Sequence, residues 1–269
     1  MEYDPIKDKL AAILLGSPLL RKFLFFLERQ VFLRELVIRS ELRKMKRNGF
    51  KPARILDAGT GYGQYAYYLS RLFPDAQIIS IDIKADSMRQ MQNFCNAESI
   101  DNLDCAQMDL LQLEATEGYD MILNVDVMEH IDDDNKVFRN FKKVLNQNGR
   151  LLLHTPALAE NSPLIADKTD FSVGEHVREG YRHSEMRDRL AKAGFRNIII
   201  TPTYGSIGGI GWKLGVRLPM QMLGLSLLTL PLVLIWLVLV ILPVRILNSI
   251  DICVNKKYGG CLLVEAKVE

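Results

Sequence analysis

An uncharged, apolar stretch late in the chain limits what this sequence can fold into. It runs from Leu218 to Val244, which is 27 consecutive positions without a charged residue. A helix of about 20 apolar residues can cross a bilayer, so the stretch must be buried in protein or lie in a membrane. Pro231 divides it into halves of about 12 residues, or roughly 18 Å of helix each. This division predicts a hairpin that enters one leaflet and returns.

The chain before this stretch has the pattern of a soluble α/β domain. From Arg54 onward, short apolar segments typical of buried strands alternate with helical segments. This alternation indicates a doubly wound, mostly parallel sheet. The predicted strands cover 54–59, 77–83, 103–110, 119–127, 150–156, 196–204 and 258–268, and the predicted helices cover 63–73, 86–96, 133–149 and 184–195, the last with Ser184 as N-cap.

The predicted sheet restricts how the apolar stretch can meet a membrane. Strand 196–204 precedes it and strand 258–268 follows it. If both strands belong to one sheet, both ends of the stretch lie on the same side of the bilayer, which argues against a single crossing. Lys213, Arg217 and Arg245 flank the stretch, and basic flanks favour the cytoplasmic side. A buried hairpin or a dimer interface is the alternative.

The N-terminal region carries a local excess of positive charge. Residues 1–54 contain thirteen Lys and Arg against six Asp and Glu, although the net charge of the whole chain is only +2. The pattern from Ser17 to about Lys46 is that of one long helix. It is either a helix packed on the domain or a basic amphipathic helix on anionic lipids, and the apolar stretch favours the second interpretation.

A glycine-rich loop follows the first predicted strand, in the sequence ILDAGTGYG. Glycines allow a sharp turn and a close approach by a ligand, and the helix beyond offers free N–H groups. The segment from Gly61 to Ala66 also fits G-x-G-x-x-A, the weak fingerprint of dinucleotide-binding proteins. Asp57 comes before the glycines, however, and a carboxylate there suits an ammonium group and would repel a pyrophosphate.

Two further acids end the next predicted strands. Asp82 ends the second strand, where it can accept the hydroxyls of a ribose, and Asp109 ends the third. Strand ends of this kind meet at one edge of the sheet and form a ligand crevice. For any one of these acids the alternative is a helix N-cap or a turn. A dehydrogenase remains the competing class of enzyme, because Asp82 also fits its ribose-binding acid.

The chain resembles class I S-adenosylmethionine-dependent methyltransferases. The resemblance is carried by four motifs in this order: ILDAGTGYG, SIDI, MDL and DMILNVDVMEHI. It covers about residues 50–203 and 259–268. The resemblance implies a seven-stranded sheet of order 3-2-1-4-5-7-6 with strand 7 antiparallel. It also implies the cofactor, S-adenosylmethionine. Its implied binding residues are Asp57, Gly59, Thr60, Gly61 and Gly63 for the methionine half, Asp82 for the ribose, Ile83, Asp109 and Leu110 for the adenine, and Asn124 near the transferred methyl group.

Candidate catalytic groups are densest in NVDVMEHIDDD, which contains the candidates Asp126, Glu129 and His130. His130 can serve as a general base, because its ordinary pKa is near neutral. Alternatively, Asp126, Glu129 and His130 bind a divalent metal, since the run is similar to the acidic-His stretch of quinone-biosynthesis O-methyltransferases. A strand-to-helix turn capped by acids is the structural alternative.

A second cluster, GEHVREGYRHSEM, follows the fifth strand. In the family this region forms the substrate lid, which makes His176, Arg178 and Tyr181 further candidates. Arg178 can bind an anionic group of the substrate, or the loop is ordered by its own hydrogen bonds. His154, on the fifth strand, is expected to be a core histidine.

These observations predict three regions: a basic helical region at 1–49, a methyltransferase domain at 50–205 and 258–269, and a membrane-associating helical insertion at 206–257. The expected function is methyl transfer to a lipid-like or amphipathic small molecule at the cytoplasmic face of the membrane. A non-catalytic membrane scaffold of the same fold is the alternative. Nucleic acid is not an expected partner, because the sequence lacks an aromatic and basic RNA-binding platform.

Overall fold

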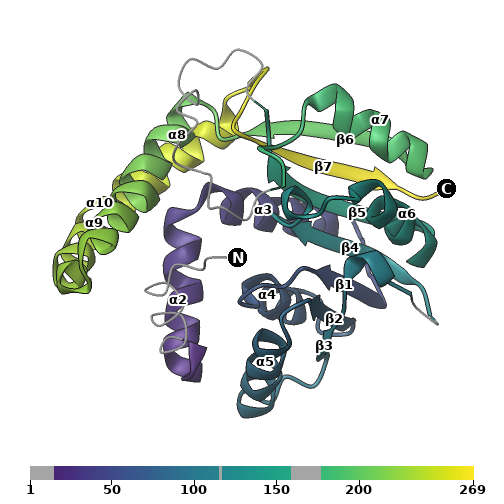
Figure 1. Cartoon of the computed structure of the whole chain (residues 1–269), viewed down its shortest axis with the longest axis horizontal. Coiled ribbons are helices and arrows are strands. Elements are labelled where there is room, and N and C mark those ends of the chain that lie inside the picture. The colour runs from purple at the N-terminus through teal and green to yellow at the C-terminus, as the bar shows by residue number, and fades with distance from the viewer. Residues whose placement is uncertain (1–14, 115–116, 159–176) are drawn as a thin grey trace. The chain divides into compact units, whose positions relative to one another are not determined.

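The computed structural model describes residues 15–114, 117–158 and 177–269. The chain forms two compact units (Figure 1). The first is helical and contains the described residues up to Leu42 together with Pro202–Gly260. The second is an α/β unit that contains Arg43–Leu158, the described residues from 177 to Thr201, and Cys261–Glu269.

The α/β unit is built on the predicted seven-stranded sheet. Its strand order is β3-β2-β1-β4-β5-β7-β6, as expected. β5 pairs in antiparallel fashion with β7, with Leu153 opposite Val264. The strands are β1 (Arg54–Ala58), β2 (Gln77–Asp82), β3 (Leu103–Gln107), β4 (Tyr119–Val125), β5 (Leu145–Pro156), β6 (Arg196–Thr203) and β7 (Cys261–Lys267).

Helices cover the sheet and bury its apolar strands. Ile55 and Leu56 in β1 have no exposed surface, because β1 lies between β2 and β4 in the middle of the sheet. On α6, Phe138 and Phe141 project onto the core and are also fully buried. The helices of this unit are α4 (Gln64–Leu72), α5 (Ala85–Ala97), α6 (Asp134–Val144) and α7 (His183–Ala193).

Several predicted boundaries are wrong, including the following three. The helix predicted to reach residue 149 ends at Val144, because Leu145 is extended and pairs with Tyr119 at the start of β4. Helix α7 begins at His183 with Arg182 in the N-cap position, so Ser184 is inside the helix. β3 ends at Gln107, two residues before Asp109.

The predicted long N-terminal helix is broken at Phe32, which has an extended backbone. It forms two helices, α2 (Pro18–Val31) and α3 (Leu33–Arg47). Side chains from far along the sequence satisfy backbone groups beside the break. Asn248 Nδ2 donates to the Val31 carbonyl at 3.2 Å, and the Arg34 N–H donates to the Tyr204 hydroxyl at 3.1 Å. The tertiary partners therefore stabilise a break that the local pattern does not predict.

The apolar stretch lies in a helical hairpin between β6 and β7. Its turn is at residues 226–229, not at Pro231, which sits in the first turn of the second arm where a missing N–H has no cost. The arms are therefore longer than predicted. The first contains α8 (Ser206–Trp212), a π-helical segment (Lys213–Arg217) and α9 (Leu218–Leu225), and the second is α10 (Leu230–Cys253).

Glycines allow the two arms to pack closely near their base. A side chain on Gly211 would place its Cβ 2.7 Å from Asn248 Oδ1, and one on Gly215 would lie 3.3 Å from Val244. Asp251 accepts a hydrogen bond from Gly208 N at 3.0 Å. The two ends of the insertion also meet, because the Gly260 N–H donates to the Tyr204 carbonyl at 2.9 Å.

The outer half of the hairpin is apolar and exposed. Among the described helices, α10 is long and apolar enough to cross a membrane by length and composition, with a mean hydropathy of 2.7 over a window that is only 17% buried. Leu225 and Leu228 at the turn are 84% and 89% exposed. An exposed apolar surface of this kind is unusual for a soluble domain.

Candidate functional site

The glycine loop after β1 has the backbone that its sequence predicts. Gly59, Gly61 and Gly63 all have positive φ, at +86°, +56° and +91°. The N–H groups of Gly59 and Thr60 donate to the carbonyl of Ile81 at 2.8 and 3.0 Å, which ties the loop to the end of β2. The loop and the start of α4 therefore lie at the carboxyl edge of the parallel strands.

Substitution of two of these glycines should separate strain from steric overlap. A Cβ on Gly59 would lie 2.3 Å from Val127 Cγ2, whereas one on Gly61 would have no heavy atom within 4 Å. Gly61→Ala should reduce the free energy of unfolding by about 1–2 kcal/mol through backbone strain. Gly59→Ala should cost about 2–5 kcal/mol, because overpacking is added to the strain. Urea denaturation measures both values, and equal losses would contradict this geometry.

Asp57, at the end of β1, is buried below this loop. Thr60 Oγ1 donates to Asp57 Oδ2 at 3.0 Å and also contacts Ser80 Oγ. Burial raises the pKa of Asp57 to about 7, the Thr60 hydrogen bond opposes that rise, and the charge of Asp82 adds to it. The carboxyl group therefore changes its protonation near neutral pH, and a cationic ligand group would favour its ionised form.

Asp82 ends β2, as predicted, and holds the glycine loop. Its Oδ2 accepts the Gly61 N–H and its Oδ1 accepts the Lys84 N–H, both at 3.0 Å. Each carboxylate oxygen retains a further acceptor site. Ile83 beside it is 63% exposed, so its apolar side chain is accessible to a ligand.

Asp109 lies beyond the end of β3 and caps a short 3₁₀ helix, Leu110–Gln112. Its Oδ1 accepts the Leu111 N–H at 2.9 Å, and the Leu110 side chain is buried. Gln107, rather than Asp109, is paired with Asp82 in the sheet. The capping interpretation therefore accounts for the geometry of Asp109, and its contact with an adenine stays a prediction.

Asn124, the next-to-last residue of β4, is fully buried beside β1. Its Nδ2 donates to the Ala58 carbonyl at 2.7 Å. Its Oδ1 has no hydrogen-bond partner among the described residues. A buried acceptor without a partner is costly, so a donor from a bound ligand would stabilise this position.

The predicted metal ligands do not converge. Asp126 Oδ1 is 2.7 Å from His154 Nδ1, Glu129 Oε2 accepts from Thr155 Oγ1 at 3.1 Å, and His130 is exposed. Within residues 15–114, 117–158 and 177–269, no group of three His, Cys, Asp or Glu side chains is arranged to hold a metal. The metal hypothesis therefore has no support in this part of the chain, and the role of His130 as a base stays a prediction.

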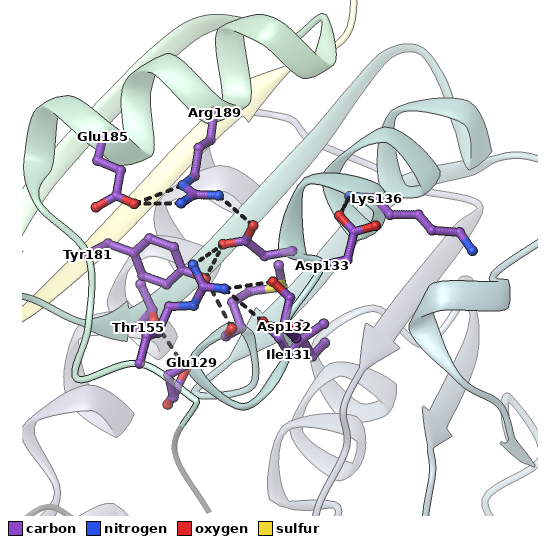
Figure 2. A network of polar contacts seen from close by, with 12 residues as sticks. Glu129, Ile131, Asp132, Asp133, Lys136, Thr155, Tyr181, Glu185 and Arg189 are labelled. Carbon is purple, nitrogen blue, oxygen red and sulfur yellow. Dashed lines mark hydrogen bonds and ion pairs between the residues drawn. The ribbon is translucent and has the colours of Figure 1, made fainter.

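Arg178 and Tyr181 both contact Asp134, in a polar network of which Figure 2 labels Tyr181 and Arg189. Arg178 Nη1 and the Tyr181 hydroxyl both lie 2.7 Å from Asp134 Oδ2, and Arg189 Nη1 lies 2.6 Å from Oδ1. Tyr181 is fully buried, and burial raises the pKa of its hydroxyl. These contacts fit the alternative in which the loop is ordered by its own hydrogen bonds, and not the catalytic roles expected for Arg178 and Tyr181. His176 lies outside the described residues.

Two residues that contact the candidate site were not identified from the sequence. Ser80, on β2, contacts the Thr60 hydroxyl that holds Asp57. His154, expected to be a core residue, is indeed buried but bonds to Asp126. Their positions near the ends of β2 and β5 could have pointed to the site. Neither a serine nor a histidine at such a position is by itself specific for a binding site.

A sheet of this order, with a glycine loop and acids at the ends of β1 and β2, defines the fold of class I S-adenosylmethionine-dependent methyltransferases. The model of the methyltransferase domain family matches residues 50–193, which is more than half of the chain. The chain belongs to this family.

Known proteins with similar sequences and structures agree with this assignment. Malonyl-(acyl-carrier protein) O-methyltransferase of Laribacter hongkongensis is 27% identical over 155 residues, or 54% of this chain and 51% of that protein. The chain spans about half the length of the curated relatives it matches. Phosphoethanolamine N-methyltransferase 2 of Haemonchus contortus, solved with S-adenosylmethionine, has a TM-score of 0.60 at 17% identity, covering 86% of this chain and 52% of that one. N-methyltransferase NodS of Bradyrhizobium japonicum has a TM-score of 0.51 at 14% identity, covering 87% of both chains. At these identities the two structures show the fold alone.

The residues at this edge fit S-adenosylmethionine. Asp57 and Asn124 Oδ1 offer buried acceptors to an ammonium group, and Asp82 offers acceptors to ribose hydroxyls. The exposed face of Ile83 suits a flat apolar base. The space beside Gly61 is open, so a ligand can approach the backbone.

Proposed function

We propose that this protein transfers a methyl group from S-adenosylmethionine to a lipid-like or amphipathic small molecule at the cytoplasmic face of a membrane. The observation that carries this proposal is the exposed apolar hairpin inserted between β6 and β7 of a methyltransferase sheet. The family assignment supports the methyl transfer, and the hairpin supports the membrane and the class of acceptor.

The chain's own residues bind and orient the cofactor in this proposal. Asp57, with the loop Gly59–Gly63, binds the methionine half, and Asp82 binds the ribose hydroxyls. Asn124 lies near the methionine end, where its unpartnered Oδ1 accepts a hydrogen bond. The cofactor supplies the electrophile, a methyl group on a sulfonium sulfur. The protein then has to align the acceptor with that methyl group and keep water away.

The hairpin is suited to entering one leaflet. The Gly260–Tyr204 hydrogen bond joins its two ends, so both ends lie on one side of the bilayer. No charge lies between Arg217 on the first arm and Arg245 on the second. The uncharged part of α10, Leu230–Val244, is about 22 Å long, which is less than the roughly 30 Å of a hydrocarbon core. The apolar turn would remain in hydrocarbon, because Leu225 and Leu228 do not suit an aqueous surface on the far side.

Basic residues at the base of the hairpin support the orientation. Lys213, Arg217 and Arg245 lie where the uncharged segment begins and ends. If the uncharged segment lies in hydrocarbon, these three side chains lie at the membrane surface, where they can contact anionic headgroups of the cytoplasmic leaflet. Helix α2 adds a second apolar surface, because Leu19, Phe23 and Phe26 are 73%, 47% and 53% exposed.

The names of the related proteins are consistent with such an acceptor but do not identify it. By their name, the relatives called malonyl-(acyl-carrier protein) O-methyltransferase act on malonyl-(acyl-carrier protein). A malonyl group on a carrier is related to lipid chemistry, which fits a lipid-like acceptor. We propose an oxygen or carbon acceptor on a molecule that partitions into the bilayer.

Mass spectrometry would test this function directly. Purified full-length protein is incubated with washed native membranes and S-adenosylmethionine carrying a deuterated methyl group. We expect a product in the lipid extract with the mass of one labelled methyl group added. Cofactor binding without any labelled product would instead indicate the non-catalytic scaffold.

Cofactor affinity should depend on pH, because the methionine ammonium needs an ionised Asp57. The pKa of Asp57 in the free protein is about 7, so the ionised fraction falls tenfold for each pH unit well below that value. Affinity for S-adenosylmethionine should therefore decrease about eightfold between pH 6.5 and 5.5 and level off above pH 8. Adenosine lacks the methionine half and serves as the matched control in calorimetry. Equal pH dependence for both ligands would contradict this role of Asp57.

A further inference from the structure

Two buried hydroxyl groups, those of Thr60 and Ser80, connect Asp57 to β2. Thr60 Oγ1 lies 3.0 Å from Asp57 Oδ2 and also contacts Ser80 Oγ. Ser80 is the residue opposite Asp57 where β1 pairs with β2. Asp57, Thr60 and Ser80 are 2%, 3% and 0% exposed, so solvent has little access to their polar atoms. The two hydroxyls form a chain, here called the hydroxyl chain, that ends on the carboxyl group.

The Thr60 hydroxyl has two acceptors within reach but only one proton. Besides Asp57 Oδ2, it lies 3.1 Å from the Asp57 carbonyl oxygen, and a hydroxyl oxygen can itself accept two hydrogen bonds. When Asp57 is ionised, Thr60 donates to Oδ2 and Ser80 donates to Thr60 Oγ1. When Asp57 is neutral, Thr60 donates to the carbonyl oxygen and accepts the carboxyl proton and the Ser80 proton. Each proton of the hydroxyl chain therefore has an acceptor in both states.

The groups around Asp57 oppose one another in their effect on its charge. Burial and the charge of Asp82 on β2 favour the neutral carboxyl, whereas the hydroxyl chain and the Ala66 N–H of α4 favour the carboxylate, and the resulting pKa is about 7. On β4 the residue opposite Asp57 is the uncharged Leu123. On β3 a hydrogen bond with a second thiol, together with burial, raises the pKa of Cys105, which stays uncharged. Asp57 is thus poised between its two protonation states.

We infer that the hydroxyl chain lets Asp57 lose its proton in place, so that the site binds the ammonium of S-adenosylmethionine with release of a proton. This inference rests on the proposed function, in which Asp57 binds that ammonium. The Asp57 O–H bond breaks, its electron pair stays on the carboxylate, and the proton leaves to water. Thr60 then turns its hydroxyl from the carbonyl oxygen to Oδ2. Thr60 and Ser80 are positioning residues, because they act on the ligand through Asp57.

This role affects the free protein and the complex differently. Removal of a hydroxyl raises the pKa of Asp57 in the free protein, because the ionised carboxylate loses a donor. The ionised free protein and the complex have the same hydrogen bonds in the chain, so the affinity of the ionised form stays at its wild-type value. Cofactor affinity should therefore fall only at pH values below the new pKa. General damage to the site would instead lower affinity at every pH.

Thr60→Val tests the first hydroxyl, which it replaces with a methyl group. Nuclear magnetic resonance of the Asp57 carboxyl carbon in the free protein measures the titration midpoint, and calorimetry measures affinity for S-adenosylmethionine at pH 6.5 and 8.5. A hydrogen bond to a charged group changes an equilibrium by about tenfold, so the midpoint should rise by about one pH unit. Relative to the wild type at the same pH, affinity should fall about eightfold at pH 6.5 and less than about 1.5-fold at pH 8.5.

Ser80→Ala tests the second hydroxyl and carries the test alone if Thr60→Val does not fold. It should raise the midpoint by about half as much, because Ser80 acts mainly by polarising the Thr60 hydroxyl. Thr60→Ser keeps a hydroxyl and should keep the wild-type midpoint. Ser70→Ala is the matched control, since Ser70 is also a buried serine but donates to the Tyr67 carbonyl at 2.9 Å, and it should change neither quantity.

Two kinds of failure can be told apart in these experiments. An unchanged midpoint in both Thr60→Val and Ser80→Ala, or an equal loss of affinity at pH 6.5 and 8.5, would overturn the inference and leave the proposed function in place. A wild-type protein that binds S-adenosylmethionine and adenosine with the same pH dependence would overturn the role of Asp57 in the proposed function, and this inference with it.

Discussion

Asp57→Asn is expected to weaken binding of S-adenosylmethionine at least 100-fold and, at alkaline pH, to stabilise the free protein. Burial raises the folded-state pKa of Asp57 from 3.8 to about 7. For a carboxyl group with a raised pKa, the stabilising effect is fully present below the unfolded-state value and is lost as pH rises through about 7. At pH 8 the free protein therefore carries a buried, ionised carboxylate, and replacing it should raise the free energy of unfolding by on the order of 1–4 kcal/mol.

The same substitution removes the charge that binds the methionine ammonium. Loss of one partner of a buried ion pair costs about 3–5 kcal/mol, so affinity should fall at least 100-fold. Calorimetry measures the affinity, and urea denaturation at pH 5 and pH 8 measures the stability. Asp104→Asn, an exposed carboxylate on β3, is the matched control and should change neither. Undiminished affinity, or a loss of stability at pH 8, would show that Asp57 has another role.

The double substitution Leu225→Glu and Leu228→Glu should release the protein from membranes. Both side chains are more than four-fifths exposed at the turn of the hairpin, so the unbound fold should tolerate the change. A charged side chain in hydrocarbon costs about 2.5–3.5 kcal/mol on insertion scales, and less near the interface. Two of them should lower the partition coefficient at least 100-fold. Flotation with vesicles that contain 30% anionic phospholipid measures the effect.

Two controls make this flotation experiment specific. Ile199→Glu introduces a charge at an exposed isoleucine on β6, in the α/β unit, and should leave flotation unchanged. Calorimetry should give the double variant the wild-type affinity for S-adenosylmethionine, because the cofactor residues lie in the other unit. A double variant that floats like the wild type would show that the hairpin turn does not enter the bilayer.

The α/β fold was predictable because its signals are local. β1 and β2 are short apolar runs that end in Asp57 and Asp82, and the glycine loop marks the turn between strand and helix. The break at Phe32 was not predictable, because its stabilising partners, Tyr204 and Asn248, are about 170 and 216 positions away. The position of the hairpin turn also depends on tertiary packing, in which Gly211 and Gly215 fix how the arms meet.

The site also has a part that was predictable from the sequence and a part that was not. Acids at strand ends could be located from the sequence, because the ends of parallel strands meet at one edge of the sheet regardless of the loop conformations. The roles of Arg178 and Tyr181 could not, because Asp134, more than forty positions away, engages both of them. The sequence predicts that His154 is a core residue of its strand. Its link to the site is the 2.7 Å contact between His154 Nδ1 and Asp126 Oδ1, which the sequence does not reveal.

The most direct test of this account measures where the methyl label goes. The full-length protein is given tritiated S-adenosylmethionine and vesicles reconstituted from native membrane lipids, and the products are divided between organic and aqueous phases. We predict label in the organic phase from the wild type and at least tenfold less from the Leu225→Glu, Leu228→Glu variant. Equal labelling by both proteins, or label confined to water-soluble products, would contradict a methyltransferase that acts on molecules within the bilayer.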